Sequence, residues 1–290
     1  MAHVHVRSDR RALGVALALV VGFAGVEAVA GWLSGSLALL ADAGHMLSDG
    51  LALGLALAAA VLAQRPATPR RSFGWRRAEI LAALVNAVLL VALGLWIVVS
   101  AVRRLGDAPE VEAGWVLATG VAGLLVNLAA ARVLHGAGRG LNVRAALLHV
   151  LADLASSVGV VAAGVVVLLT GWHAADAVAG LVIGVLVLAS TWRVLGESVG
   201  ILLEAAPRGL DVDAVARAMR AAEGVVELHD LHVWTITSGF PALSAHVLVE
   251  PRADCHGIRL RLERLLAERF ELTHTTLQVE HAQGLVQLSR

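Results

Sequence analysis

The chain has 290 residues, of which 58% are hydrophobic and only 16% are charged, and its mean hydropathy is +0.77. A soluble domain has no use for so much apolar surface, so the composition indicates an integral membrane protein. The 23 basic residues, all of them Arg, balance 23 acidic ones, and a formal net charge of zero gives no sign of a nucleic-acid partner. A single cysteine, Cys255, excludes an internal disulfide and a CxxC metal site.

Six apolar segments follow one another along the first two thirds of the chain, each long enough to cross a bilayer as a helix, which takes about 20 residues. The predicted spans are residues 12–33, 37–63, 78–102, 113–134, 145–170 and 174–195. The first span follows Arg7, Arg10 and Arg11, but it is too long for a signal peptide and lacks a convincing cleavage site. We therefore treat it as a retained span.

Arginine is concentrated in the loops after the second and fourth spans. These loops contain Arg65, Arg70, Arg71, Arg76 and Arg77 in one case, and Arg132, Arg139 and Arg144 in the other. The loops after the first and fifth spans contain none. Because short cytoplasmic loops are enriched in Arg, we expect both termini to face the cytoplasm.

Two of the spans each contain a His followed four residues later by an Asp: His45 with Asp49, and His149 with Asp153. Residues four apart lie on one face of a helix, about one turn apart. Two such helices face to face supply two imidazole nitrogens and two carboxylate oxygens. This set suits tetrahedral Zn²⁺, and it suits related divalent ions less well. The alternative is a set of ordinary hydrogen bonds within the bundle. A repeated pair of ionisable groups at membrane depth is costly, however, and is typical of an ion pathway.

Other polar residues in the spans have more than one interpretation. Asn86 and Asn127 are expected to bond to neighbouring helices or to line the ion path. Asp42 lies one turn before His45 and is either part of a vestibule or a carboxylate at a helix start. Glu27 is not easily dismissed as a structural residue, and Asp176 is expected to cap the sixth helix.

The character of the sequence changes after Pro207, where charge rises and the apolar runs shorten. We therefore divide the chain into a transmembrane transport domain, residues 1–207, and a soluble domain, residues 208–290. The soluble domain is predicted to contain a helix at 211–222, strands at 225–237 and 242–249, a helix at 255–270 and a strand at 275–280. The order αββαβ suits a small sheet with helices on one face and an open face or edge for a partner.

The soluble domain holds half of the 12 histidines: His229, His232, His246, His256, His274 and His281. Alternate residues of a strand point to opposite faces, so His229 and His232 are expected on opposite faces, with only one of them a ligand. His246 and Glu280 on the neighbouring strands are placed to join that ligand, between strands or between subunits. The alternative is a set of surface histidines that bind no metal.

Four stretches together resemble the cation diffusion facilitator family, and within it the bacterial zinc exporters that have His-Asp pairs on the second and fifth helices. They are SLALLADAGHMLSDG, FGWRRAEILAALVN, LHVLADLASSVGVV and LHDLHVWTITSGFPALSAHV. The resemblance covers almost the whole chain. It implies a homodimer of six-helix, all-α transmembrane bundles, each with a cytoplasmic α+β ferredoxin-like domain, that exports metal from the cytoplasm in exchange for protons.

Individual residues are carried over by position. The resemblance implies a transport site made of His45, Asp49, His149 and Asp153. It implies a regulatory zinc site in the cytoplasmic domain made of His229, His246, Glu280 and His256. Arg77 and Glu204 resemble a pair that joins the third helix to the base of the soluble domain in relatives.

Two departures from the family pattern limit what is carried over. Gln278 stands where some relatives have His, which argues against a full two-metal cluster, and the His-rich loop between spans four and five is reduced to His135. His3 and His5 are either a substitute for that loop or a terminus without a role in metal capture. The sequence assigns no role to His274 and His281.

The sequence thus predicts a proton-coupled antiporter for Zn²⁺, with Cd²⁺, Co²⁺ and Ni²⁺ as open alternatives, in the lipid of a bacterial inner membrane. Two other classes compete with this interpretation. An intramembrane metallohydrolase needs an open coordination position and a general base, and the chain has no HExxH motif, so we do not expect an enzyme. A membrane metal sensor would depend on the cytoplasmic histidines and have a dispensable buried site.

Overall fold

The computed structural model describes residues 2–135 and 141–282, with the side chains of residues 2–12 and 141–145 left out. The side chains of His3, His5 and Arg144 and the whole of Arg139 therefore lie outside the described part. The chain divides into a helical unit, Met1–Ala58 with Ala82–Leu195, and a C-terminal unit, Ala59–Leu81 with Gly196–Arg290. Each unit is described by itself.

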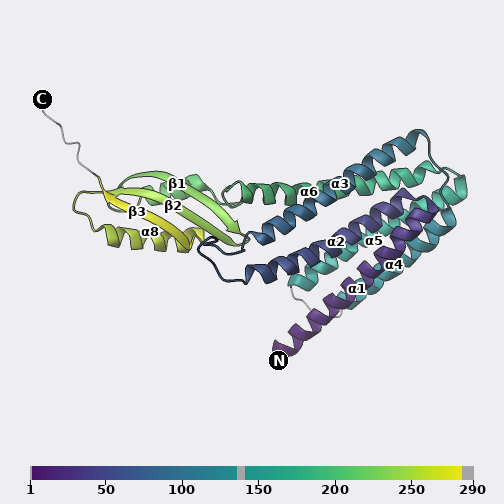
Figure 1. Ribbon diagram of the computed structural model, residues 1–290, viewed down its shortest axis with the longest axis horizontal. Coiled ribbons are helices and arrows are strands. Elements are labelled where there is room, and N and C mark those ends of the chain that lie inside the picture. The colour runs from purple at the N-terminus through teal and green to yellow at the C-terminus, as the bar shows by residue number, and fades with distance from the viewer. Residues whose placement is uncertain (1, 136–140, 283–290) are drawn as a thin grey trace. The chain divides into compact units, whose positions relative to one another are not determined.

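The described residues up to Leu202 form six long helices joined by loops (Figure 1). They are α1 (Ala2–Ser34), α2 (Leu37–Ala63), α3 (Ala78–Gly106), α4 (Ala113–His135), α5 (Leu141–Thr170) and α6 (Ala174–Leu202). Each contains a stretch of at least 22 residues with hydropathy of 1.8 or more, long and apolar enough to cross a membrane. Large apolar side chains such as Leu57, Leu169 and Trp192 are 67%, 76% and 71% exposed, as expected where lipid is the solvent. The predicted six-span bundle is confirmed.

Small residues line the contacts between α1, α4 and α5, which lie against one another. Ala16, Ala24 and Ala130 are buried there, and Gly123 of α4 faces Phe23 and Glu27 of α1. A Cβ atom at Gly123 would lie 3.0 Å from both of those side chains, so glycine here permits an unusually close approach of the two helices.

Asp176 corrects one expectation from the sequence. It lies in the first turn of α6, but its carboxylate caps the start of α2: Oδ2 accepts from the backbone N–H of Leu37 at 2.6 Å, and Oδ1 accepts from the hydroxyl of Ser36 at 2.5 Å. The first N–H groups of α2 have no acceptor within their own helix, and α2 has no acidic residue in its first turn. A carboxylate from a neighbouring helix fills that place.

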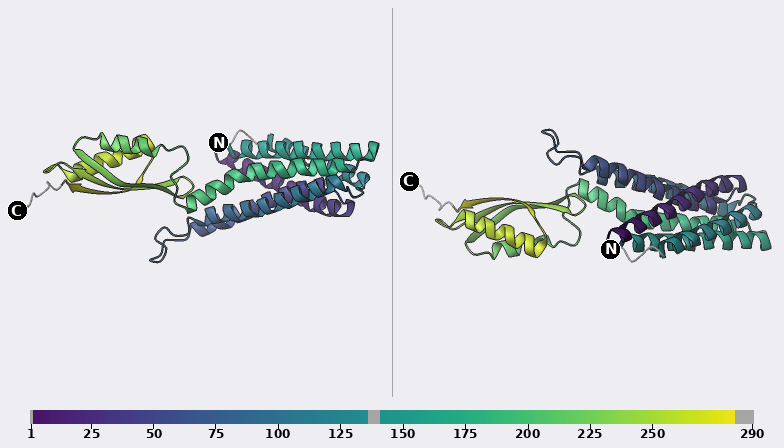
Figure 2. Two further views of the ribbon diagram at one scale, coloured as in Figure 1. Left: turned by 90° about the horizontal axis from the view of Figure 1, so that it is seen from above. Right: turned by 90° about the horizontal axis from the view of Figure 1, so that it is seen from below.

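The C-terminal unit contains the predicted αββαβ order, which is confirmed. Its elements are α7 (Val212–Arg220), β1 (Val225–Thr237), β2 (Phe240–Val249), α8 (Cys255–Phe270) and β3 (His274–His281). The sheet order is β1-β2-β3, antiparallel between β1 and β2 and parallel between β2 and β3. Both helices cover one face of the sheet (Figure 2), where Met219 of α7 and Leu262 of α8 pack with Leu243 and Val247 of β2. On the opposite face, within the described residues, His232 and Ser244 line a pocket together with the loop before α3, and His229 and His246 are partly exposed.

A β-bulge in β1 changes which side chains lie on this opposite face. His229 pairs with His246 and His232 pairs with Ser244, so Asp230 and Leu231 together oppose a single residue of β2. Asp230 has the positive φ of 49° that the extra residue requires. Residues 244 and 246 share a face of β2, and therefore His229 and His232 share a face as well. The expectation that they lie on opposite faces was wrong, because strict alternation fails across a bulge.

Candidate metal centres

The two His-Asp pairs of α2 and α5 meet inside the helical unit. Asp49 Oδ2 lies 3.0 Å from His149 Nε2 and 3.7 Å from His45 Nε2. Asp153 lies 3.8 Å from His149 Nε2 through Oδ2 and 4.0 Å from His45 Nε2 through Oδ1. Four ligands around Zn²⁺ at bond lengths of about 2.0 Å are about 3.3 Å apart. The ligand atoms of three of these side chains, His45, Asp49 and Asp153, all lie within 4.8 Å of one another, which is close enough for one ion. His149 adjoins this group through its 3.0 Å contact with Asp49. We call the four side chains the four-ligand cluster.

Burial within the four-ligand cluster is uneven. The side chain of Asp153 is 2% exposed, whereas His45, Asp49 and His149 are 24%, 27% and 46% exposed. Both carboxylate oxygens of Asp153 are buried and have no hydrogen-bond donor among the described residues. A buried carboxylate without donors is costly unless a cation or a proton compensates it. The chemistry of this donor set fits a divalent cation.

A cavity of about 970 Å³ opens onto the four-ligand cluster. It is lined by residues of α2, α3, α5 and α6, including all four ligands, Asn86 and Ser156. Most of the other lining residues are apolar, among them Leu90, Val182 and Val187. The cavity places open space beside the cluster within an otherwise apolar lining. Asn86, expected to bond a neighbouring helix or to line the ion path, lines this cavity.

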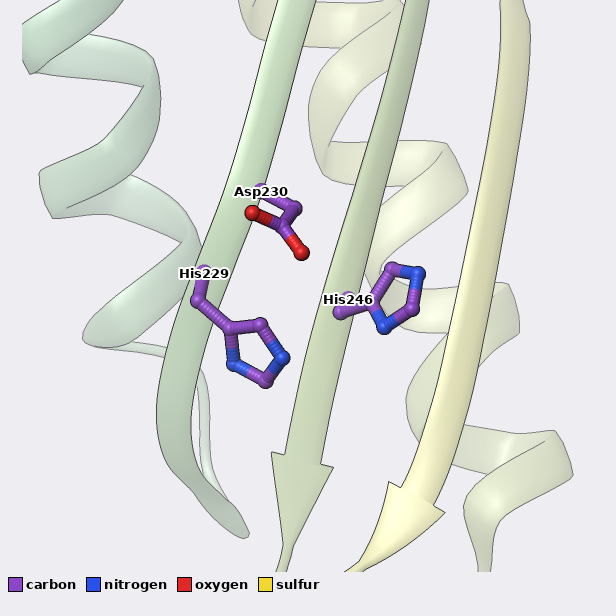
Figure 3. A group of neighbouring side chains, drawn as sticks. All are labelled: His229, Asp230 and His246. Atoms are coloured by element: carbon purple, nitrogen blue, oxygen red, sulfur yellow. The ribbon is translucent and has the colours of Figure 1, made fainter.

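A second group of metal-ligating side chains lies on the sheet of the C-terminal unit. His229, Asp230 and His246 each offer one ligand atom, and these atoms all lie within 4.8 Å of one another. Figure 3 shows the three side chains on the adjacent strands β1 and β2. The two imidazole rings are 5.3 Å apart between centroids, and the bulge places Asp230 beside them. We call this group the sheet cluster.

Two other sequence-predicted ligands do not join the sheet cluster within this chain. His246 pairs with Gln278 of β3, whereas Glu280 pairs with Leu248 further along the strand. The amide of Gln278 also donates to the carboxylate of Glu280. His256 lies in the first turn of α8, on the helix that covers the opposite face of the sheet.

Sequence reasoning missed Asp230. A signal was present in the spacing of the apolar residues of β1, because Leu228 and Val233 are five residues apart and yet both are buried in one core. An odd spacing between two inward-facing residues of a strand requires an extra residue between them. The residue that supplies it tolerates a positive φ, as Asp does more readily than most.

Two of the remaining histidines of the C-terminal unit, His274 and His281, have neighbours outside the sheet cluster. His274 lies between the rings of Phe73 and Phe240, at centroid distances of 5.9 Å and 5.2 Å. His281 Nε2 lies 3.0 Å from the carbonyl oxygen of Ala253 and 3.4 Å from Sγ of Cys255.

The expected pair of Arg77 and Glu204 is present at 3.3 Å. Its side chains are 39% and 65% exposed, and ion pairs this accessible to solvent contribute little stability. Nearby, the hydroxyl of Thr237 donates to Glu79 Oε2 at 3.0 Å. Two polar contacts therefore join the start of α3 to other parts of the C-terminal unit.

A six-helix membrane bundle with two His-Asp pairs facing each other, followed by a small α+β domain, defines a class of integral membrane proteins that handle metal cations. Residues 13–203 match the cation efflux transmembrane domain, and residues 207–282 match the cytoplasmic domain of cation efflux proteins, which is the family's dimerisation domain. The chain belongs to the cation efflux family.

Curated relatives are similar over their full length. The metal cation efflux system protein CzcD of Cupriavidus metallidurans is 41% identical, covering 97% of this chain and 89% of the relative. The zinc transporter ZitB of Escherichia coli is 42% identical, covering 96% of this chain and 90% of the relative. The cadmium, cobalt and zinc/H⁺-K⁺ antiporter of Bacillus subtilis is 38% identical, covering 97% and 92%. The family and these relatives are transporters of metal cations and not enzymes.

Proposed function

We propose that the protein exports Zn²⁺ from the cytoplasm in exchange for protons, as a homodimer in a bacterial inner membrane with both termini in the cytoplasm. The observation that carries this proposal is the four-ligand cluster, which joins two imidazoles and two carboxylates from α2 and α5 at 3.0–4.0 Å. The names of the relatives support export of zinc and related metals.

The ligand set favours Zn²⁺ over Cd²⁺, Co²⁺ and Ni²⁺. Imidazole nitrogen and carboxylate oxygen are borderline and hard ligands, and Zn²⁺ takes four of them in a tetrahedron without a geometric penalty. Cd²⁺ is larger and softer, and it gains more from thiolate, which the cluster lacks. Co²⁺ and Ni²⁺ share the ligands but tolerate tetrahedral geometry less well.

Each pair of ligands has a separate part in the exchange. An imidazole binds a metal ion only when it is neutral, so protons arriving at His45 and His149 compete with Zn²⁺ and expel it. Asp49 and Asp153 supply two negative charges, which offset the cost of removing a divalent cation from water. Because the ligands come from two helices, a relative movement of α2 and α5 weakens the site and allows release on the other side.

The sheet cluster is proposed to bind regulatory zinc from the cytoplasm. His229 and His246 supply two imidazoles, and Asp230 supplies a carboxylate oxygen from the bulge. Glu280 and His256 do not reach these residues within one chain, so in this proposal they are contributed by the second subunit. Metal binding would then hold the two cytoplasmic domains together and bias the helices toward one arrangement.

The test is zinc flux into proteoliposomes under an imposed pH gradient. The native protein is compared with Asp49→Ala, which removes a transport ligand, and with His229→Ala, which removes a sheet ligand. We expect flux to require the gradient, to be lost in Asp49→Ala, and to continue with altered dependence on zinc concentration in His229→Ala.

Two results would decide against the proposal. Zinc binding without flux in either direction would favour a membrane sensor. Flux that survives Asp49→Ala at the native rate would show that the four-ligand cluster is not the transport site. A matched control is Asp107→Ala, which removes an exposed carboxylate from the loop after α3.

A further inference from the structure

Two carboxylates outside the four-ligand cluster are fully buried in the helical unit. Glu27 of α1 is 1% exposed and Asp42 of α2 is 0% exposed. Neither forms an ion pair among the described residues. We call these two residues the inner acidic pair.

The surroundings of the inner acidic pair contain few positive charges. The charged groups that act on Glu27 are Asp42 of α2 and Asp153 of α5, both acidic. Those acting on Asp42 are Asp153 and His45. From α4 the neighbouring groups are Gly123, whose position faces Glu27, and the neutral Asn127 one turn further on. Asp153 in turn is acted on by His45 and His149 and by the further carboxylate of Asp49, so two histidines stand against four carboxylates. Two carboxylates as deeply buried as Glu27 and Asp42 do not both remain ionised without a compensating cation or proton.

The polar atoms around the inner acidic pair also show which kind of group is needed. Ser156 donates to Oδ1 of Asp42, and the amide of Asn127 donates to the hydroxyl of Ser157 at 3.2 Å. Three further oxygens are buried and meet no donor within the described residues: Glu27 Oε2, Asp42 Oδ2 and Asn127 Oδ1. All three oxygens are hydrogen-bond acceptors, so each of them requires a hydrogen-bond donor. A protonated carboxyl supplies such a donor and removes one negative charge at the same time.

Ser156 connects Asp42 of the inner acidic pair to the cavity beside the four-ligand cluster. Ser156 lines the cavity that opens onto the four-ligand cluster, and its hydroxyl donates a hydrogen bond to Asp42. A hydroxyl accepts one proton while it donates another, so a proton can pass between the cavity and Asp42 through Ser156. Neither acid lies among the cavity-lining residues, so the two acids lie behind the cavity wall and Asp42 meets it through Ser156.

We propose that Glu27 and Asp42 together hold one proton, which leaves when a divalent cation enters the four-ligand cluster and returns when the cation departs. The inference rests on the proposed function and adds to it a carrier of the exchanged proton that is not a metal ligand. On metal entry, the positive charge beside Asp153 favours ionisation of the pair. One carboxyl O–H bond breaks, the carboxylate keeps the electron pair, and the proton passes through Ser156 to water in the cavity. The reverse transfer accompanies release of the metal.

The first experiment counts the protons released when Zn²⁺ binds to the full-length protein in detergent, by calorimetry in buffers of different ionisation enthalpy. For each Zn²⁺ bound at the four-ligand cluster, we expect Glu27→Gln to release about one proton fewer than the native protein. Its zinc affinity is expected to stay within about threefold of the native affinity. Glu27→Asp keeps a titratable group and is expected to restore the native count. Glu112→Gln makes the same chemical change at an exposed position and is expected to match the native protein.

Asp42→Asn tests the other member of the inner acidic pair and is expected to lower the count by the same amount. Native counts in both Glu27→Gln and Asp42→Asn would overturn the proposal. The measurement requires binding and not flux, so it is independent of the proteoliposome test: a protein that releases this proton but moves no zinc would contradict the proposed function alone.

A measurement on the native protein covers the case in which the variants do not fold. The infrared difference spectrum between zinc-free and zinc-bound protein is expected to show the loss of a carbonyl band from a buried, protonated carboxylic acid. A spectrum without that band would overturn the proposal. So would displacement of K⁺ by zinc in place of proton release, since the pair would then hold a monovalent cation.

Discussion

Asp49 lies closer to His149 of α5, at 3.0 Å, than to His45 of its own helix, at 3.7 Å. The shortest contact in the four-ligand cluster therefore crosses between helices. The spacing of each pair within its helix is fixed by backbone hydrogen bonds, whereas the distance between the helices depends on side-chain packing and can change. The affinity of the four-ligand cluster for Zn²⁺ should therefore rise as α2 and α5 move closer together and fall as they separate.

Replacement of His149 tests this relationship. His149→Ala removes one of four ligands and the partner of Asp49, and we expect zinc affinity in detergent to fall at least about 100-fold, or about 2.7 kcal/mol. Zinc binding should also lose part of its dependence on pH, because one competing imidazole is gone. Titration calorimetry on the native protein and on His149→Ala measures both effects. Asp49→Ala and Asp153→Ala are measured in turn for comparison. An affinity within threefold of native would contradict a four-ligand site.

Asp176 offers a prediction about stability that is separate from metal binding. Asp176→Ala leaves the hydroxyl of Ser36 and the N–H of Leu37 without their buried acceptor, and such losses cost about 1–3 kcal/mol. We expect a lower thermal unfolding midpoint in detergent and an unchanged zinc affinity. Asp176→Asn keeps one acceptor oxygen and should lose less. Equal midpoints for native and Asp176→Ala would show that the cap of α2 contributes nothing.

Much of the fold follows from patterns that the sequence displays openly. The starts of α2, α3, α4 and α6 agree with the predicted spans, because an apolar run of this length has few alternatives to a transmembrane helix. The His-Asp pairs could be found for the same reason, since four-residue spacing in a helix has one geometric meaning. Local periodicity was sufficient in both cases.

Contacts between elements were less predictable. The cap from Asp176 to Ser36 joins residues 140 positions apart, and nothing near Asp176 distinguishes it from a cap of its own helix. The bulge at Asp230 moves every later residue of β1 by one position, so an alternation counted from His229 assigns His232 to the wrong face. The fault lay in applying a period of two across an insertion.

Asp230 also leads to a prediction about the sheet cluster. Its φ of 49° lies in the left-handed region, which Gly adopts at no cost. Asp230→Gly therefore keeps the bulge and removes only the carboxylate, and we expect zinc affinity at the sheet cluster to fall about tenfold, or about 1.4 kcal/mol. The full-length protein with Asp49→Ala and Asp153→Ala isolates this site for calorimetry. If zinc affinity were unchanged in Asp230→Gly, Asp230 would not be a ligand, and β1 would supply only His229 to the sheet cluster.

Asp230→Val gives a contrast to the glycine variant. A β-branched residue at positive φ costs about 1–3 kcal/mol, so we expect this variant to lose the bulge or to lower the stability of the sheet. His229 and His232 would then return to opposite faces, and the sheet cluster would lose an imidazole. If Asp230→Val bound zinc as tightly as Asp230→Gly, the bulge would not be what aligns His229 with His246.

The start of α7 provides a prediction about pH. The backbone N–H of Ala214 donates to Asp211 at 2.9 Å and, with the guanidinium of Arg217 nearby, lowers the pKa of that carboxyl below its ordinary value of 3.8. A group whose pKa is lower in the folded state stabilises the fold above the unfolded-state pKa, and this contribution is lost as the pH falls through the folded-state pKa. The cap should therefore protect α7 fully above about pH 5 and fail progressively below about pH 4.

Hydrogen exchange of an α7 peptide from the intact protein is expected to differ between native and Asp211→Ala at neutral pH and to converge below the folded-state pKa. Glu223→Gln, an exposed carboxylate beyond the end of α7, should match the native protein throughout. If the difference between native and Asp211→Ala persisted unchanged at the lowest pH, the ionised carboxylate would not be the capping species.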